Sequence, residues 1–126
     1  MNPARKKILL VDDEKEMLEF LANFLQRNDY DVVFTSRGSE ALQLAIESKP
    51  DLIVLDIVMP DIDGGELALL MSKEPAIAKA PIIFLTGIIR DGDELNKIKA
   101  VKDYSVVSKP LDPKKFLDTI KEALSA

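Results

Sequence analysis

Five short apolar runs recur at fairly even intervals along the chain, and stretches with helical spacing separate them. Three of the runs are almost continuous Ile, Leu and Val, a composition typical of strands that are buried on both faces. The pattern therefore predicts five strands, at residues 8–11, 32–35, 52–55, 82–85 and 104–107.

The stretches between the runs repeat apolar residues at i, i+3 and i+4, which predicts helices that each bury one stripe. The first stretch includes Phe20 and Phe24, and we expect both rings, with that of Phe116, to lie in the core. Asp112 and Pro113 are suitable residues for the start of the last helix. Helices are predicted around residues 17–25 and 41–46, after residue 64, at 93–102 with few apolar anchors, and from residue 113 onward.

This alternation of strand and helix predicts a parallel sheet with helices on both faces. Because crossovers between parallel strands are right-handed, few strand orders are available, and 2-1-3-4-5 is the usual order at this size. We therefore expect a doubly wound, flavodoxin-like α/β fold with five helices, in one domain that spans residues 1–126. Met1 and the short tail are features expected of a complete protein.

The composition narrows the chemistry that such a fold can support. The 126 residues include no His and no Cys, and their formal net charge is −5. A metal would therefore need oxygen ligands, which favours Mg²⁺, Mn²⁺ or Ca²⁺ over zinc. The negative charge argues against nucleic-acid binding, and no apolar run is long enough for a membrane helix. A cytoplasmic location is expected, since that compartment suits a chain without disulfides.

Three carboxylates follow strands that are neighbours in this sheet. Asp12 and Asp13 follow the first strand, and Asp56 follows the third. All three should meet where the strand order reverses, at the edge where such sheets bind ligands. A single Asp at a strand end is often only a turn or cap residue, but three together repel one another unless a cation neutralises them. We therefore predict a Mg²⁺ site, with Mn²⁺ as a substitute.

Two further polar residues, Thr86 and Lys109, follow the fourth and fifth strands at the same edge. Each has an ordinary interpretation, as a β-branched strand residue and as a surface residue before a proline. Beside a metal-bound carboxylate, however, a hydroxyl and an ammonium form a phosphate-binding set. Asp56, at the end of the central strand, is then the predicted nucleophile. A nucleotide site and a serine hydrolase are disfavoured, because the chain has neither a glycine-rich phosphate loop nor a GxSxG turn with a His partner.

Four segments, in this order along the chain, resemble the receiver domain of two-component response regulators, especially the stand-alone kind typified by the chemotaxis regulator. They are ILLVDDE at 8–14, DIVMPDIDG at 56–64, FLTG at 84–87 and SKPL at 108–111. The resemblance extends over essentially the whole chain. It implies a signalling module that accepts and loses one phosphoryl group, rather than a turnover enzyme.

The resemblance also implies a role for each acidic residue. Asp56 would accept the phosphoryl group. Asp13, Asp56 and the main-chain carbonyl of Val58 would bind Mg²⁺, and Asp12 would act mostly through a water on the metal.

For the remaining residues, the resemblance implies that Thr86 and Lys109 contact the phosphoryl oxygens and that the Lys109–Pro110 peptide is cis. The implied donor is a histidine kinase or a histidine phosphotransfer protein. The output would be an unidentified protein that binds the face formed by the last two helices and the last strand. The chain would be a monomer or a phosphorylation-dependent dimer.

The sequence departs from the family pattern at three places. Val106 stands where the family usually has an aromatic residue that moves inward, and the nearest aromatic residue is Tyr104. Residues 100–103 replace the usual Gly-Ala before the last strand. Val58 and Ile88 are apolar at two positions that influence dephosphorylation. Because neither supplies an amide or an acid for hydrolysis, we predict a long-lived phosphoryl group.

Two other functions fit parts of the pattern. A Mg²⁺-dependent phosphatase would also use an Asp nucleophile, but such enzymes typically place a second acid two residues later, where this chain has Val58. They also carry a cap, for which this chain is too short. A receiver used only for docking would have lost the acceptor or the metal acids, and this sequence retains both.

Overall fold

The computed structural model describes residues 5–87, 101 and 103–125 of the chain. Within this part, all five predicted strands are confirmed, each one residue longer than predicted. The helix predicted at 93–102 falls, apart from Val101, outside the described residues. The described elements are β1 (Lys7–Val11), α1 (Lys15–Arg27), β2 (Asp31–Thr35), α2 (Gly38–Ser48), β3 (Leu52–Asp56), α3 (Gly64–Lys73), β4 (Ile82–Thr86), β5 (Tyr104–Ser108) and α5 (Pro113–Ser125).

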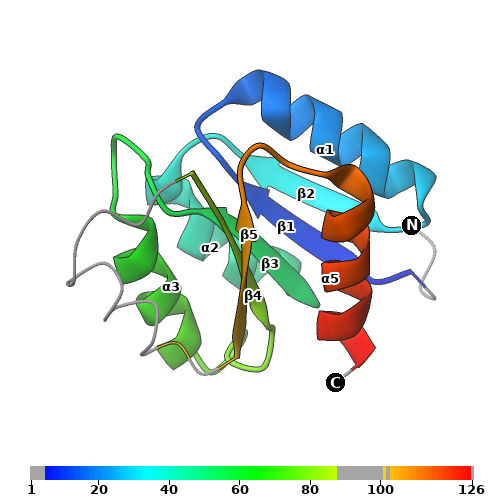
Figure 1. Cartoon of the computed structure of the whole chain (residues 1–126). Helices are drawn as coiled ribbons and strands as arrows, with labels where there is room; N and C mark the ends of the chain where they lie inside the picture. The colour runs from blue at the N-terminus through cyan, green and yellow to red at the C-terminus, as the bar shows by residue number, and fades with distance from the viewer. Residues whose placement is uncertain (1–4, 88–100, 102, 126) are drawn as a thin grey trace.

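The five strands form one parallel sheet in the order β2-β1-β3-β4-β5 (Figure 1). The predicted strand order and the doubly wound α/β fold are thus confirmed, with four helices in the described part of the chain. The order reverses beside β1, because the chain first runs outward to β2 and then crosses back to β3. This reversal makes the carboxyl ends of β1 and β3 adjacent.

Successive residues of each strand point to opposite faces of the sheet, and each face has its own core. One face packs against α1 and α5, and the other packs against α2 and α3 (Figure 1). Leu9, Ile53 and Phe84 belong to the α2/α3 core, whereas Leu10 and Val54 belong to the α1/α5 core. All five residues of β3 are buried, which explains its nearly continuous apolar sequence.

The aromatic residues of the α1/α5 layer agree only in part with their predicted burial. Phe116 is fully buried, as predicted. The prediction for Phe20 was wrong, because 51% of this residue is exposed, and Phe24 is only partly buried. The buried stripe of α1 includes Leu18 and Leu21. At about 100° per residue, Phe20 lies roughly 200° around the helix from Leu18, so it points toward solvent, where its ring stacks on that of Phe24.

The predicted start of the last helix is confirmed. The carboxylate of Asp112 accepts hydrogen bonds from the amides of Lys114 (3.0 Å) and Lys115 (3.4 Å), as an N-cap residue does. None of the helices described is long and apolar enough to cross a membrane.

Candidate phosphoacceptor and metal site

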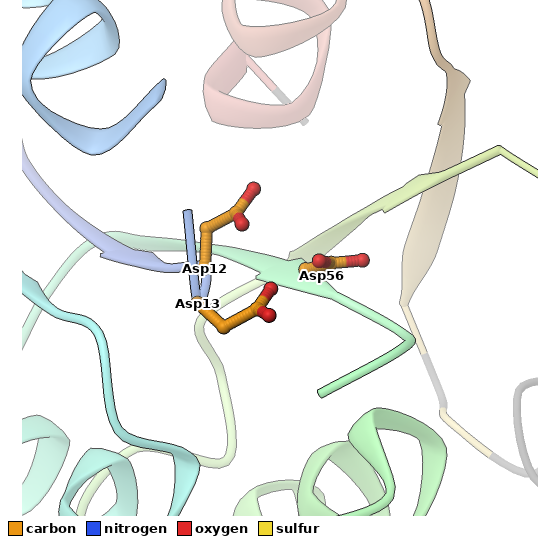
Figure 2. Close-up of side chains that lie close together, drawn as sticks. All are labelled: Asp12, Asp13 and Asp56. Atoms are coloured by element: carbon orange, nitrogen blue, oxygen red, sulfur yellow. The ribbon is translucent and has the colours of Figure 1, made fainter. Parts of the chain in front are cut away.

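The structure brings together the three predicted carboxylates. Asp12 and Asp13 follow β1 directly, and Asp56 is the last residue of β3 (Figure 2). One carboxylate oxygen from each of the three lies within 4.8 Å of the others. The reversal of strand order thus places the cluster at the carboxyl edge of the sheet, as the sequence predicted.

The three acids differ in how the fold holds them. Asp12 is 1% exposed and Asp56 is 5% exposed, whereas Asp13 is open to solvent. Asp12 Oδ1 accepts a hydrogen bond from the amide of Glu14 (2.9 Å), and Asp56 Oδ1 accepts one from the amide of Val58 (3.2 Å). Each buried carboxylate is therefore oriented by the backbone that follows it, with one oxygen left for another partner.

That other partner is Lys109. Its Nζ lies 3.3 Å from Asp12 Oδ2, 3.4 Å from Asp56 Oδ2 and 3.4 Å from Glu14 Oε1. The Lys109 amide donates to the carbonyl of Thr86 (2.9 Å), and the Lys109–Pro110 peptide is cis, as the resemblance implied. The contact with Glu14 was not predicted, although its position directly after the paired acids was a usable signal.

Burial and mutual repulsion change the protonation of this cluster. Burial has the largest effect on the pKa of Asp56, and the charge of Asp12 has the second largest. Together they raise this pKa to about 6, although Lys109 and the Val58 amide act to lower it. Burial also raises the pKa of Asp12. For Lys109, burial lowers the pKa, but the neighbouring carboxylates of Asp12 and Asp56 outweigh it and the pKa is raised. At Asp56, burial and the repulsion from Asp12 therefore outweigh the charge of one neighbouring ammonium.

Thr86 ends β4 beside this cluster and is 5% exposed. Within the described residues, its Oγ1 is the buried side-chain polar atom without a hydrogen-bond partner. A buried hydroxyl in this state is costly, and native structures usually satisfy it with a ligand, ion or water. Thr86 is therefore suited to donate to an oxygen that arrives at the site.

The loop after β3 is packed closely against the acceptor strand. Val58 and Asp63 form an isolated antiparallel bridge, and the amide of Gly64 donates to the carbonyl of Ile57 (2.9 Å). A Cβ on Gly64 would overlap the carbonyl oxygen of Asp56 and lie 2.6 Å from Ile57 Cα. Gly64 thus allows the start of α3 to approach the backbone of the acceptor residue.

The positions at which the sequence departs from the family pattern are partly described. Val106 is 43% exposed and Tyr104 is 37% exposed, and the Tyr104 ring packs edge-on against Phe84 with centroids 6.0 Å apart. The Val58 side chain is 49% exposed at the start of the loop. Ile88 lies outside the described residues.

The chemistry of this donor set fits a hard divalent cation. It offers oxygens from several carboxylates, which Mg²⁺ prefers, and the described part of the chain has no His or Cys ligand that would favour zinc. The buried Thr86 hydroxyl and the Lys109 ammonium add two donors for the oxygens of an anion.

A doubly wound sheet with an acidic cluster, a hydroxyl and a lysine at its switch point defines a class of signalling module. The chain belongs to the response regulator receiver domain family, whose pattern matches residues 8–121. Receiver domains of this family bind Mg²⁺ in an acidic pocket, and they are generally signalling modules rather than turnover enzymes.

Individual relatives agree with this assignment. The chain is 30% identical over 119 residues to the polar-differentiation response regulator DivK of Brucella anthropi, covering 94% of this chain and 96% of DivK. It is 36% identical over 119 residues to the alkaline phosphatase synthesis transcriptional regulatory protein PhoP of Bacillus subtilis, covering 94% of this chain and 48% of PhoP. Among solved structures, chemotaxis protein CheY4 of Vibrio cholerae is similar, with a TM-score of 0.87, 29% identity and coverage of 96% and 100%.

Proposed function

We propose that residues 1–126 act as one receiver domain that accepts a phosphoryl group on Asp56 in a Mg²⁺-dependent reaction. The observation that carries the proposal is the meeting of three carboxylates with Lys109, which lies 3.4 Å from Asp56 Oδ2. The hydroxyl of Thr86 at the same edge, which has no hydrogen-bond partner in the part of the chain that the structure describes, supports it.

In the proposed reaction, Asp56 Oδ2 attacks the phosphorus of a phosphohistidine on a histidine kinase or histidine phosphotransfer protein. A P–O bond forms and the P–N bond breaks, and its electron pair stays on the imidazole, which leaves neutral with a proton on its other nitrogen. Lys109 stabilises the charge on the transferring group, and Thr86 donates to one of its oxygens.

Asp12, Asp13, Asp56 and the carbonyl of Val58 would hold the Mg²⁺ ion, and Mn²⁺ would substitute for it. The bound ion would neutralise charge shared by the acids and the phosphoryl oxygens. The direct ligands are proposed to be Asp13, Asp56 and Val58, with Asp12 more distant. Asp13 is exposed, whereas Asp12 is buried and already accepts from the Glu14 amide and from Lys109, which supports Asp13 rather than Asp12 as the direct ligand after β1.

A phosphoryl group on Asp56 would pull Thr86 and Lys109 toward it. Since the Lys109 amide is bonded to the Thr86 carbonyl, the ends of β4 and β5 would respond together. We propose that this change alters the binding of a partner protein to β5, α5 and the preceding segment, as a monomer or as a phosphorylation-dependent dimer. The exchange is proposed to take place in the cytoplasm, without nucleic acid or membrane as a partner.

Intact mass after incubation with acetyl phosphate and Mg²⁺ tests the proposal. Wild type should gain one phosphoryl group, and the gain should be absent with chelator and in Asp56→Asn. Asp118→Asn, which removes an exposed carboxylate on α5, should behave as wild type. A gain in Asp56→Asn equal to that of wild type would disprove the assignment of Asp56. Repeated turnover of a generic phosphate ester would favour the phosphatase, and absence of Mg²⁺ binding would favour a docking module.

A further inference from the structure

The loop between β3 and α3, residues 57–63, begins directly after Asp56 and includes Val58. Its first residue is fixed to the sheet, since the amide of Ile57 donates to the carbonyl of Leu85 (3.2 Å). Its last residue, Asp63, caps α3. The middle of the loop lies between these anchors, and the half-exposed side chain of Val58 contributes little to holding it. The position of Val58 therefore depends on its backbone bridge to Asp63 and on what the middle of the loop contacts.

The middle of the loop is bonded to α2 through Asp61. Asp61 Oδ1 accepts a hydrogen bond from the amide of Gly38 (3.2 Å), and Oδ2 accepts one from the amide of Ser39 (2.9 Å). These are the first two residues of α2, and the preceding Arg37 provides no side-chain cap. Asp61 thus supplies the acceptor that a helix usually takes from its own N-cap residue. The amides of Ser39 and Gly38 lower the pKa of Asp61, which keeps it ionised at neutral pH.

Packing at Gly38 joins the same two segments independently of charge. A Cβ on Gly38 would overlap Cγ2 of Ile62 and approach Cε of Met59 to 3.2 Å. Gly38 does not have a positive φ, so close approach of the loop, rather than backbone conformation, favours a glycine here. Hydrogen bonds from Asp61 and contact with Ile62 therefore both tie the loop to the start of α2.

We propose that Asp61 is a positioning residue for the metal site. By accepting from the first two amides of α2, it holds the loop so that Val58 stays beside Asp56, as the 3.2 Å bond from the Val58 amide to Asp56 Oδ1 requires. This inference rests on the proposed function, in which the Val58 carbonyl binds Mg²⁺. Without the Asp61 bonds, the loop samples other arrangements, and the apparent affinity falls with the fraction of competent loop.

Calorimetric titration with Mg²⁺ tests this role directly. Asp61→Ala should raise the dissociation constant about tenfold, as loss of a residue that supports a metal ligand does. Asp61→Asn keeps an acceptor oxygen and should lie between Asp61→Ala and wild type. Glu66→Ala removes an exposed carboxylate from the first turn of α3 and should change the constant by about twofold or less, because solvent and salt screen its charge.

Gly38→Ala tests the contact between the start of α2 and the loop without changing any charge. It should weaken Mg²⁺ binding by pushing Ile62 away, and Gly38→Ala combined with Ile62→Ala should recover most of the affinity. Wild-type affinity in folded Asp61→Ala, or in Gly38→Ala where Asp61→Ala does not fold, would overturn the positioning role. Equal losses in Asp61→Asn and Asp61→Ala would also overturn it, since charge alone would then explain them. If wild type binds no Mg²⁺, the proposed metal site itself fails, and this role with it.

Discussion

The ammonium of Lys109 lies 3.4 Å from Asp56 Oδ2 and, at 3.3 Å, equally near Asp12 Oδ2. One protein cation thus occupies the space that separates two buried carboxylates. A metal ion that binds the same acids must share them with this ammonium. Lys109 is therefore expected to oppose metal binding while it favours phosphoryl transfer, and the two effects can be measured separately.

Replacing Lys109 with Met keeps the length of the side chain and removes its charge. We expect Mg²⁺ affinity to rise roughly fivefold, because a partly exposed ion pair is worth about 1 kcal/mol. Phosphorylation by acetyl phosphate should slow by about 100-fold, as loss of a donor to a developing charge does. Lys114→Met, on the exposed side of α5, is the control for both measurements. Weaker Mg²⁺ binding in Lys109→Met would contradict competition between the two cations.

The raised pKa of Asp56 predicts a pH-dependent effect of Asp56→Asn on the ion-free protein. The pKa of Asp56 is about 6 in the folded protein, against an ordinary value of 3.8 for an Asp carboxyl group, so ionisation of Asp56 opposes folding as pH rises from about 4 to 6. At pH 7, Asp56→Asn should raise the free energy of unfolding by on the order of 1–2 kcal/mol, part of the gain being offset by the lost pairing with Lys109. The difference should disappear below about pH 4.

Urea unfolding with chelator present, at pH 3.5, 5 and 7, measures this difference. In saturating Mg²⁺ the order should reverse, since the ion stabilises the wild-type cluster by binding to the folded state. Asp118→Asn controls for the loss of one exposed carboxylate. A wild-type protein more stable than Asp56→Asn in chelator at pH 7 would exclude strain in the acid cluster.

The buried hydroxyl of Thr86, which has no hydrogen-bond partner among the described residues, predicts that its removal stabilises the resting protein. Thr86→Val keeps the shape and should raise the free energy of unfolding by about 1 kcal/mol, because a buried unsatisfied polar group is costly. It should also weaken the response to phosphorylation, seen as smaller amide shift changes at the end of β5 in NMR spectra. Thr119→Val is the control. Because the Thr119 hydroxyl already donates to the carbonyl of Lys115 (3.0 Å), its removal should not raise the free energy of unfolding.

Close packing at Gly64 predicts a loss of stability on adding one methyl group. Gly64→Ala should lower the free energy of unfolding by about 2 kcal/mol, because the new Cβ would overlap the carbonyl of Asp56 in a tightly packed site. Gly87→Ala is the matched control, since no heavy atom of the described structure lies within 4 Å of the Cβ position there. Its effect should stay within about 0.5 kcal/mol. Equal effects of the two substitutions in urea unfolding would exclude this packing role.

The half-exposed side chain of Val58 predicts slow loss of the phosphoryl group. Val58→Asn places an amide beside Asp56 that can orient a water, and it should speed decay of the phosphorylated protein by about tenfold. Intact mass at intervals after removal of acetyl phosphate follows the decay. Val58→Leu, which adds no polar group, should decay at the wild-type rate, and an equally fast decay would indicate simple opening of the site.

The sequence predicted the sheet and the acid cluster because both follow from short-range patterns. The continuous apolar run at 52–55 is typical of a central strand that is buried on both faces. The order of the strands then brings Asp12, Asp13 and Asp56 together. The burial of Phe20 was predicted wrongly because the apolar stripe of α1 is wider than the surface it covers. Only the packing of the helix decides which side of such a stripe remains exposed.

The contacts of Asp61 could not be predicted in the same way. Asp61 bonds to residues 22 and 23 positions away, in a helix whose own N-cap position lacks a side-chain acceptor. Contacts of this kind depend on how closely a loop approaches the start of a helix in the folded chain. The periodic pattern of the sequence contains no information on that distance. The sequence identifies the residues that carry charge, and the tertiary structure determines which partner each one meets.

The burial of β3 on both faces also has a consequence for the motions of Asp56, at the end of the strand, and of Val58, in the loop that follows. Its backbone amides are shielded by two layers of helices, so they should exchange with solvent only when the whole molecule unfolds. Val58, two residues beyond the strand, is instead half exposed, so we expect its amide to exchange with solvent in smaller, local openings. Asp56 therefore stands at a boundary between the slowest and the faster motions of the protein, which lets the surroundings of the acceptor rearrange while the acceptor stays in place.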